Sequence, residues 1–270
     1  MCLIALHHDP DGPVVLRLVA NRDEFHARPT APLAEWPDIE GVVGGRDLQA
    51  GGSWLAAHRR GRVAALTNVR DPSLLGHPDS PSRGHLVTTA LTTEDPLGWL
   101  EQLASGEALA YAGFNLLVAD GKHLWHLRRG REGLSLSSLA PGVHGLSNAD
   151  LDTPWPKLVR VRQALARCLE LGDWPTTALA AFANEQLAAD AELPDTGMGI
   201  ELERRLSAAF IHGQDYGTRA TTCLEWRADG RLELQEFSYG PNAVRIGSRR
   251  LVISTPPVTA PEPASVGARR

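Results

Sequence analysis

The sequence predicts an α+β fold in which helices pack outside two antiparallel sheets, giving a four-layer α/β/β/α sandwich. Pairs of short apolar runs joined by Asp, Gly or Pro turns fill both ends of the chain, and such pairs are typical of antiparallel hairpins. Segments with helical periodicity lie in separate blocks between them. Strands and helices that are segregated along a chain favour this class over an alternating α/β fold.

The first hairpin, residues 1–24, is the element around which the rest of the chain is organised. Two apolar runs flank a turn over residues 9–12, and the second run ends in Asn21-Arg22-Asp23-Glu24. Antiparallel pairing brings this polar cluster back beside Cys2, at the start of the first strand. A thiol, an α-amine and several charged side chains then share one end of a sheet, which predicts a reaction centre there.

The other strands follow the same pattern of apolar runs and polar turns. Three more hairpins are predicted over residues 54–67, 114–127 and 216–237, and a short strand over residues 143–148. The proline-rich residues 26–39 and the glycine-dense residues 44–53 are predicted to be loops. The glycine-dense stretch lacks the Lys-Ser/Thr that a phosphate-binding loop requires, so its glycines indicate turns and close backbone approach.

Helices are predicted over residues 83–91, 95–104, 157–171, 176–188 and 200–210. The best defined of these begins at Lys157 and carries apolar residues on one face, namely Leu158, Val161, Leu165 and Leu169. No repeat and no linker divides the chain, so we expect one domain over residues 1–254. Residues 255–270, rich in Pro and Ala, are predicted to form a mobile tail.

Composition excludes several classes of function. The net charge of −5 gives no electrostatic case for a nucleic-acid partner or an anionic membrane. The N-terminus lacks the basic region of a signal peptide, and no apolar stretch approaches the ~20 residues of a membrane span. The three cysteines are far apart and lack metal-binding spacing. These features predict a reduced compartment, which we take to be the cytoplasm.

Cys2 is the candidate nucleophile because of its position. Removal of Met1 by methionine aminopeptidase leaves Cys2 with a free α-amine, whose pKa lies near ~8. That amine can accept the thiol proton at neutral pH, so nucleophile and base belong to one residue. The alternative interpretation of Cys2 is a small apolar residue buried at a strand start.

Two asparagines at strand ends are candidates for oxyanion donors. Asn68 follows the second predicted hairpin, and Asn148 ends the strand over residues 143–148. Asparagine at such positions is otherwise a turn former, and both interpretations stay open.

A set of short motifs resembles the NRDE family, the homologues of Transport and Golgi organisation protein 2. The resemblance runs from residue 1 to about residue 240. The motifs are Met1-Cys2, Asn21-Arg22-Asp23-Glu24, Gly51-Gly52-Ser53-Trp54-Leu55, Leu66-Thr67-Asn68, Ser82-Arg83-Gly84, Phe114-Asn115-Leu116, Gly145-Leu146-Ser147-Asn148, Trp155-Pro156-Lys157, Pro194-Asp195-Thr196-Gly197 and Tyr216-Gly217-Thr218-Arg219.

The resemblance implies the fold of the N-terminal-nucleophile (Ntn) hydrolases, especially cysteine amidases such as choloylglycine hydrolase and penicillin V acylase. It assigns site roles to seven residues, namely Cys2, Asn21, Arg22, Asp23, Asn68, Asn148 and Arg219. Asp23 would orient the α-ammonium, and Arg22 or Arg219 would hold the thiolate or a substrate carboxylate. Arg22 and Asp23 are adjacent, unlike in those amidases, and therefore point to opposite faces of a strand. Only one of them is expected to reach Cys2, with Asn21 as a candidate substitute.

Two functions from different classes follow. The first is hydrolysis of an amide or thioester bond of a small acyl substrate, which needs no cofactor. The second is non-catalytic binding and trafficking of haem, acyl-CoA or another lipid, with Cys2, His7 or His8 as a haem ligand. A regulatory protein with a vestigial site is a third interpretation. The substrate and the oligomeric state stay open.

Overall fold

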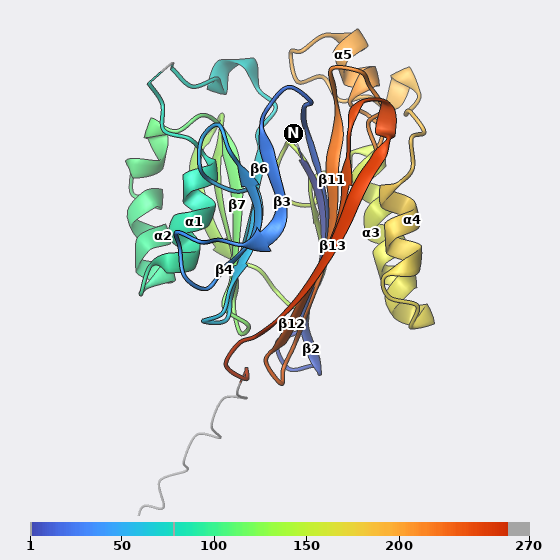
Figure 1. Cartoon of the computed structure of the whole chain (residues 1–270). Helices are drawn as coiled ribbons and strands as arrows, with labels where there is room; N and C mark the ends of the chain where they lie inside the picture. The colour runs from blue at the N-terminus through green and yellow to red at the C-terminus, as the bar shows by residue number, and fades with distance from the viewer. Residues whose placement is uncertain (1, 78, 259–270) are drawn as a thin grey trace, which may run out of the picture.

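The computed structural model describes residues 2–77 and 79–258, and it confirms the predicted α+β sandwich of four layers. Two antiparallel sheets face each other, with helices on the outer face of each (Figure 1). Helices α1 (Gly84–Thr92) and α2 (Pro96–Ala104) cover one sheet. Helices α3 (Pro156–Leu171) and α4 (Thr176–Phe182) cover the other.

The first sheet contains both strands of the N-terminal hairpin. Its strand order over the described residues is β10-β1-β2-β11-β12-β13. The bounds are β1 Cys2–His8, β2 Val14–Phe25, β10 Gly142–Leu146, β11 Tyr216–Arg227, β12 Arg231–Tyr239 and β13 Arg245–Ser254.

The second sheet is a meander of consecutive strands, β3 to β9 in order, within the same described ranges. The bounds are β3 Thr30–Glu35, β4 Val42–Asp47, β5 Leu55–His58, β6 Arg62–Asn68, β7 Phe114–Ala119, β8 Leu124–Gly130 and β9 Gly133–Ser138. The remaining helical pieces are α5 Ile200–Arg205 and 3₁₀ turns at Pro72–Leu74, Glu107–Ala110, Asp190–Glu192 and Pro241–Ala243.

Strand alternation divides the apolar residues between layers. On β1, Ile4 and Leu6 enter the core between the sheets, whereas Leu3 and Ala5 pack under α3 and α4. Because strands of this sheet are covered on both faces, they are apolar on both, which is why the sequence shows continuous runs. Burial on both faces fixes the β1–β2 register, since a slip of one residue would exchange the two faces.

The sequence prediction was wrong for the segment after the first hairpin. Residues 30–35 and 42–47 form strands β3 and β4, not loops. Pro32 lies on β3, at the edge of the second sheet, where the register shifts between Ala31 and Ala34. Proline is tolerated there because an edge strand can lack one ladder donor. Strands β9 and β13 were also missed.

Helices α4 and α5 are shorter than predicted, and a buried asparagine bonds to the end of the first of them. Asn21 donates its side-chain amide to the carbonyl oxygens of Phe182 and Ala209, each at 2.8 Å. Phe182 is the last residue of α4, so its carbonyl bonds to β2 instead of continuing the helix to residue 188. The predicted helix over residues 200–210 ends at Arg205.

The start of the predicted tail packs against the first sheet. Thr255 is buried and accepts a hydrogen bond from the Trp226 indole at 3.1 Å. The backbone N–H of Val258 donates to the Ala228 carbonyl at 2.9 Å. Residues 259–270 lie outside the described residues. Within the part that is described, no helix has the length and apolarity needed to cross a membrane.

Candidate functional site

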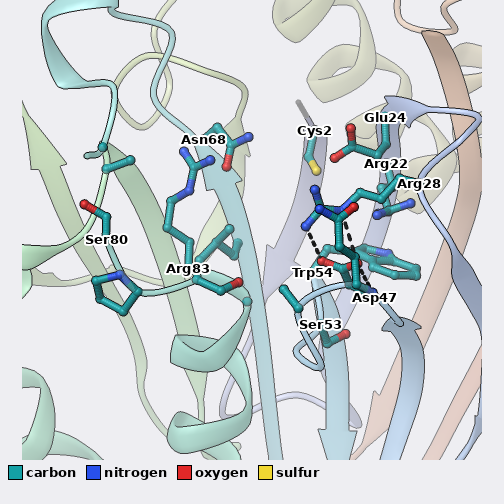
Figure 2. A pocket seen from close by; sticks show the side chains of 18 of the residues that line it. Cys2, Arg22, Glu24, Arg28, Asp47, Ser53, Trp54, Asn68, Ser80 and Arg83 are labelled. Atoms are coloured by element: carbon teal, nitrogen blue, oxygen red, sulfur yellow. Dashed lines mark hydrogen bonds and ion pairs between the residues drawn. The ribbon is translucent and has the colours of Figure 1, made fainter. Parts of the chain in front are cut away.

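Cys2 and Arg22 are directly opposite each other in the β1–β2 ladder. Both line a cleft of about 530 Å³ at one end of the sandwich, between the two sheets. Figure 2 shows the sulfur of Cys2 near Arg22 and Glu24, with Arg83 and Asn68 across the cleft. The hairpin therefore places the thiol among charged side chains, which is the arrangement that the sequence predicts for this strand end.

The thiol is not activated by its surroundings alone. Burial raises the pKa of Cys2, and the nearby carboxylates of Asp23 and Glu24 act in the same direction, while Arg22 opposes them. A thiol with a raised pKa is mostly protonated at neutral pH and needs a base to become a nucleophile.

Arg22 and Asp23 point to opposite faces of β2, as strand geometry requires. The Arg22 guanidinium lies over the Trp54 ring at 4.3 Å and donates to the Thr30 hydroxyl at 3.1 Å. Asp23 is buried and accepts a hydrogen bond of 2.7 Å from the Thr218 hydroxyl on β11. Burial raises the pKa of Asp23, against the opposing effects of Lys157, Thr218 and Arg70.

Asn21 belongs to the layer behind the site. Its side chain is fully buried, bonds to the Phe182 and Ala209 carbonyls, and accepts a hydrogen bond of 2.6 Å from the Thr221 hydroxyl. It therefore fixes β2 to the helix side of the first sheet and does not line the cleft that contains Cys2.

The two asparagine candidates have different positions. Asn68, at the end of β6, lines the same cleft as Cys2, on the side of Arg83. Asn148 is buried behind it, and its amide donates to the Asn68 carbonyl at 2.9 Å. Asn148 therefore supports Asn68 and is not itself among the cleft-lining residues.

Arg219 lies outside the cleft, in a β-bulge of β11. The β2–β11 register shifts between Thr218 and Ala220, which directs Arg219 toward the loop after β2. Its guanidinium donates to the carbonyls of Phe25 and Arg28, at 2.8 and 3.0 Å. The structure thus places Arg219 as a clamp on the loop that carries Arg28.

Sequence reasoning missed several residues of the cleft. Arg28 and Asp47 face each other in a bidentate ion pair, with N–O distances of 3.1 and 2.6 Å. Arg83 and Trp54 line opposite walls. The motifs Ser82-Arg83-Gly84 and Gly51-Gly52-Ser53-Trp54 were visible in the sequence, and they are adjacent in space because Ser53 N–H donates to the Gly84 carbonyl at 3.2 Å.

A buried ion pair supports the wall that contains Asn68. Arg70 Nη1 lies 2.5 Å from Glu203, and the two side chains are 3% and 2% exposed. The Arg70 guanidinium lies 4.7 Å over the Trp155 ring, and Nη2 donates to Asn148 at 3.5 Å. Glu203 also accepts hydrogen bonds from Thr196. Four residues from four different sequence motifs therefore meet in one network, namely Asn68, Asn148, Trp155 and Thr196.

Lys157 is a buried cation beside this network. It is 2% exposed, and its ammonium donates to the Leu206 carbonyl at 2.8 Å. Burial lowers its pKa to about 8, and Arg70 acts in the same direction, while Asp23, Cys2 and Glu203 raise it. The folded protein therefore loses this proton at a lower pH than the unfolded chain does.

We expect Lys157→Met to remove one contribution to the pH dependence of stability. Between about pH 8 and pH 10.5 the unfolded chain holds the lysine proton and the folded protein does not, so this group stabilises the fold as pH rises. The free energy of unfolding of the wild type should gain on the order of 3 kcal/mol relative to Lys157→Met across that window. Urea denaturation at several pH values measures this. Parallel profiles would contradict it, and the exposed Lys122→Met is the matched control.

No group of three or more His, Cys, Asp or Glu side chains within residues 2–77 and 79–258 could hold a metal ion. His7 and His8 end β1, at the opposite end of that strand from Cys2. Seven residues of extended strand span about 20 Å, so neither histidine shares a ligand sphere with Cys2.

Comparisons with known proteins agree with this geometry. The fold is that of the Ntn hydrolases. The C2A variant of conjugated bile acid hydrolase from Clostridium perfringens aligns over 94% of this chain and 92% of its own, with a TM-score of 0.50 and 10% identity. A second variant of that enzyme aligns over the same shares with a TM-score of 0.51 and 9% identity.

The chain belongs to the Transport and Golgi organisation 2 family, whose model matches residues 1–241. The Transport and Golgi organization protein 2 homolog of Bos taurus is 38% identical, over 88% of this chain and 93% of its own length. The homolog of Homo sapiens is 36% identical over the same shares. The family resemblance of the sequence motifs is thereby confirmed.

Proposed function

We propose that this protein is a cysteine Ntn amidohydrolase that cleaves an amide or thioester bond of a small acyl substrate in the cytoplasm. The observation that carries the proposal is the position of Cys2, at the tip of β1, opposite Arg22 and open to a cleft. The fold supports the proposal because it presents Cys2 at the start of the first strand. Once Met1 is removed and the α-amine of Cys2 is free, this residue can supply its own base.

The reaction begins after removal of Met1. The α-amine of Cys2 takes the thiol proton, and the sulfur attacks the substrate carbonyl carbon. As the S–C bond forms, the carbonyl π electrons move to oxygen. Asn68 donates to that oxyanion, a contribution of about 3–4 kcal/mol in good geometry. Arg22 stabilises the thiolate, and Asp23 orients the α-ammonium.

Three proton transfers complete the cycle. The α-ammonium protonates the leaving amine or thiolate as its bond to carbon breaks, which leaves an acyl thioester on Cys2. Water then attacks this thioester while the α-amine accepts a water proton. The acid leaves, and the proton returns to sulfur. No metal or cofactor takes part in this scheme.

Intact-mass spectrometry tests the proposal directly. Purified protein is incubated with a panel of N-acyl amides and acyl thioesters and quenched in acid. We expect a mass without Met1, an added acyl group that maps to the Cys2 peptide, and release of the free acid. A chain that has lost Met1 but neither gains an acyl group nor turns over any member of the panel would contradict the proposal.

Binding of haem, acyl-CoA or another lipid without catalysis stays a prediction of the resemblance. A haem site needs an apolar pocket with an axial Cys, His or Tyr. The cleft at Cys2 is instead lined mainly by charged and other polar side chains. Haemin titration of wild type and Cys2→Ala, followed by absorbance, tests this alternative in parallel with the mass experiment.

A further inference from the structure

Among the described residues, three guanidinium groups line the cleft, and one of these three has a carboxylate in ion-pair contact. Arg28 is paired with Asp47. Arg22 bonds to a hydroxyl and stacks on Trp54, as described above. Arg83 is half-buried and donates one hydrogen bond of 3.0 Å to the Gly113 carbonyl. Within the described residues, neither Arg22 nor Arg83 has an acidic group within ion-pair distance.

Arg83 is held in place by the fold. It is the residue before α1, and its neighbour Gly84 is pressed against the loop between β4 and β5. A Cβ on Gly52 would lie 2.3 Å from the Gly84 carbonyl carbon, so this close approach requires glycine. The motifs Gly51-Gly52-Ser53-Trp54-Leu55 and Ser82-Arg83-Gly84, which the proposed reaction does not use, are therefore packed together. Their contact fixes Arg83 on the wall facing Cys2.

The segment around the start of α1 provides further donors for a negative charge. No side chain caps the N-terminus of α1, and no acidic residue lies in its first turn. Ser80 and Ser82, on the segment leading to α1, also line the cleft. The backbone N–H groups of His85 and Leu86 in this first turn already donate to the Ser82 and Arg83 carbonyls. The guanidinium fork of Arg83 and the serine hydroxyls are the donors on this wall that a carboxylate or phosphate can accept together.

The electrostatics of Arg83 and Cys2 are coupled. Burial lowers the pKa of Arg83, while the Cys2 thiolate and Glu24 raise it and Arg28 lowers it. Glu24 bonds to the Phe25 N–H at 2.9 Å, and it shares the cleft without an ion pair to Arg83. A partly desolvated guanidinium without a close acid is stabilised when a ligand brings one.

We propose that the substrate of this cleft carries an oxoanion group, either a carboxylate or a phosphate, which Arg83 binds while the acyl carbonyl lies at Cys2. The inference rests on the proposed function for the identity of the reacting carbonyl. Arg83 is thus a specificity residue: it binds the acidic end of the substrate and takes no part in bond breaking. A cleft of about 530 Å³ suits a small substrate that presents both groups at once.

Binding to the Cys2→Ala protein separates this inference from turnover. Isothermal titration with glutarate, phenyl phosphate and the neutral pentanamide provides a carboxylate arm, a phosphate arm and an uncharged control. We expect one of the two anions to bind better than pentanamide. Arg83→Gln in the Cys2→Ala background keeps a donor for the Gly113 carbonyl and should lower the affinity for that anion about tenfold. Arg83→Lys should lower the affinity by less. The exposed Arg131→Gln is the matched control and should bind as its parent does.

The outcomes are distinguishable from those of the mass experiment. If anion binding to Cys2→Ala depends on Arg83 but the wild type never forms an acyl-enzyme, the proposed ligand class is retained and the proposed hydrolysis is rejected. Acylation of Cys2 with equal binding of anions to Arg83→Gln and its parent, at matched circular dichroism, rejects the inference alone. Failure of both anions to bind better than pentanamide also overturns it.

Discussion

Cys2→Ala is expected to lower kcat/KM for the best amide or thioester substrate by about 10⁴-fold or more, because it removes the atom that forms the acyl-enzyme. The side chain is small and at the start of a strand, so the fold should be retained. Cys223→Ala is the matched control: it removes another free thiol, one that is buried in β11, and should leave turnover within a few-fold of the wild type. Initial rates with both proteins, at matched far-ultraviolet circular dichroism, provide the measurement.

The α-amine requires a separate control, because Cys2→Ala does not test it. A fusion that places a cleavable domain directly before Cys2 blocks the amine, and cleavage after purification releases it. The blocked form should be as inactive as Cys2→Ala, and the cleaved form should recover wild-type rates. Equal rates before and after cleavage would mean that another group is the base, and unchanged turnover in Cys2→Ala would remove the nucleophile assignment altogether.

The sequence predicted the hairpin that positions Cys2, and strand physics explains this success. Two apolar runs of suitable length flank a turn. Their pairing places Asn21-Arg22-Asp23-Glu24 beside the start of β1, and this local pairing does not depend on the rest of the fold. Period-two alternation also predicted that Arg22 and Asp23 face opposite ways. The α+β class followed from the same local signals, as did the amphipathic helix α3.

Side-chain direction at the other strand ends could not be predicted in this way. Asn148 follows the short strand β10 and Arg219 lies near the start of β11, but where each side chain points depends on contacts made by distant segments. Asn148 is turned inward by its hydrogen bond to the Asn68 carbonyl. Arg219 is displaced by a β-bulge that the local sequence pattern does not predict. Arg83 was missed for a related reason. Its motif indicates only a helix start, and its place in the cleft comes from the packing of its neighbour Gly84 against Gly52.

The largest expected effect on stability lies behind the cleft, at the ion pair of Arg70 and Glu203. Both side chains are almost fully buried, so each charge depends on the other for its solvation. Glu203→Gln keeps the shape and an acceptor for Thr196 but leaves a buried guanidinium without its carboxylate. The free energy of unfolding should fall by about 3–5 kcal/mol, measured by urea denaturation at neutral pH.

A surface pair provides the comparison that isolates burial. Arg204 and Asp190 form a bidentate pair with two N–O distances of 2.8 Å, but their side chains are 32% and 60% exposed. Asp190→Asn should therefore change the free energy of unfolding by no more than about 1 kcal/mol. Similar losses in Glu203→Gln and Asp190→Asn would contradict the role of burial.

The double variant Arg70→Met/Glu203→Gln distinguishes the loss of the ion pair from the cost of leaving one buried charge without its partner. Arg70→Met alone leaves a buried carboxylate, and Glu203→Gln alone leaves a buried guanidinium, whereas the combination leaves neither. We expect the double variant to be more stable than the sum of the single losses predicts, by about 1–3 kcal/mol. Because Arg70 also reaches Asn148, and Asn148 holds the Asn68 carbonyl, the same variants should lower turnover more than Asp190→Asn does. Additive losses would mean that the two charges do not act as a pair, and unchanged turnover would mean that Asn68 is positioned by β6 alone.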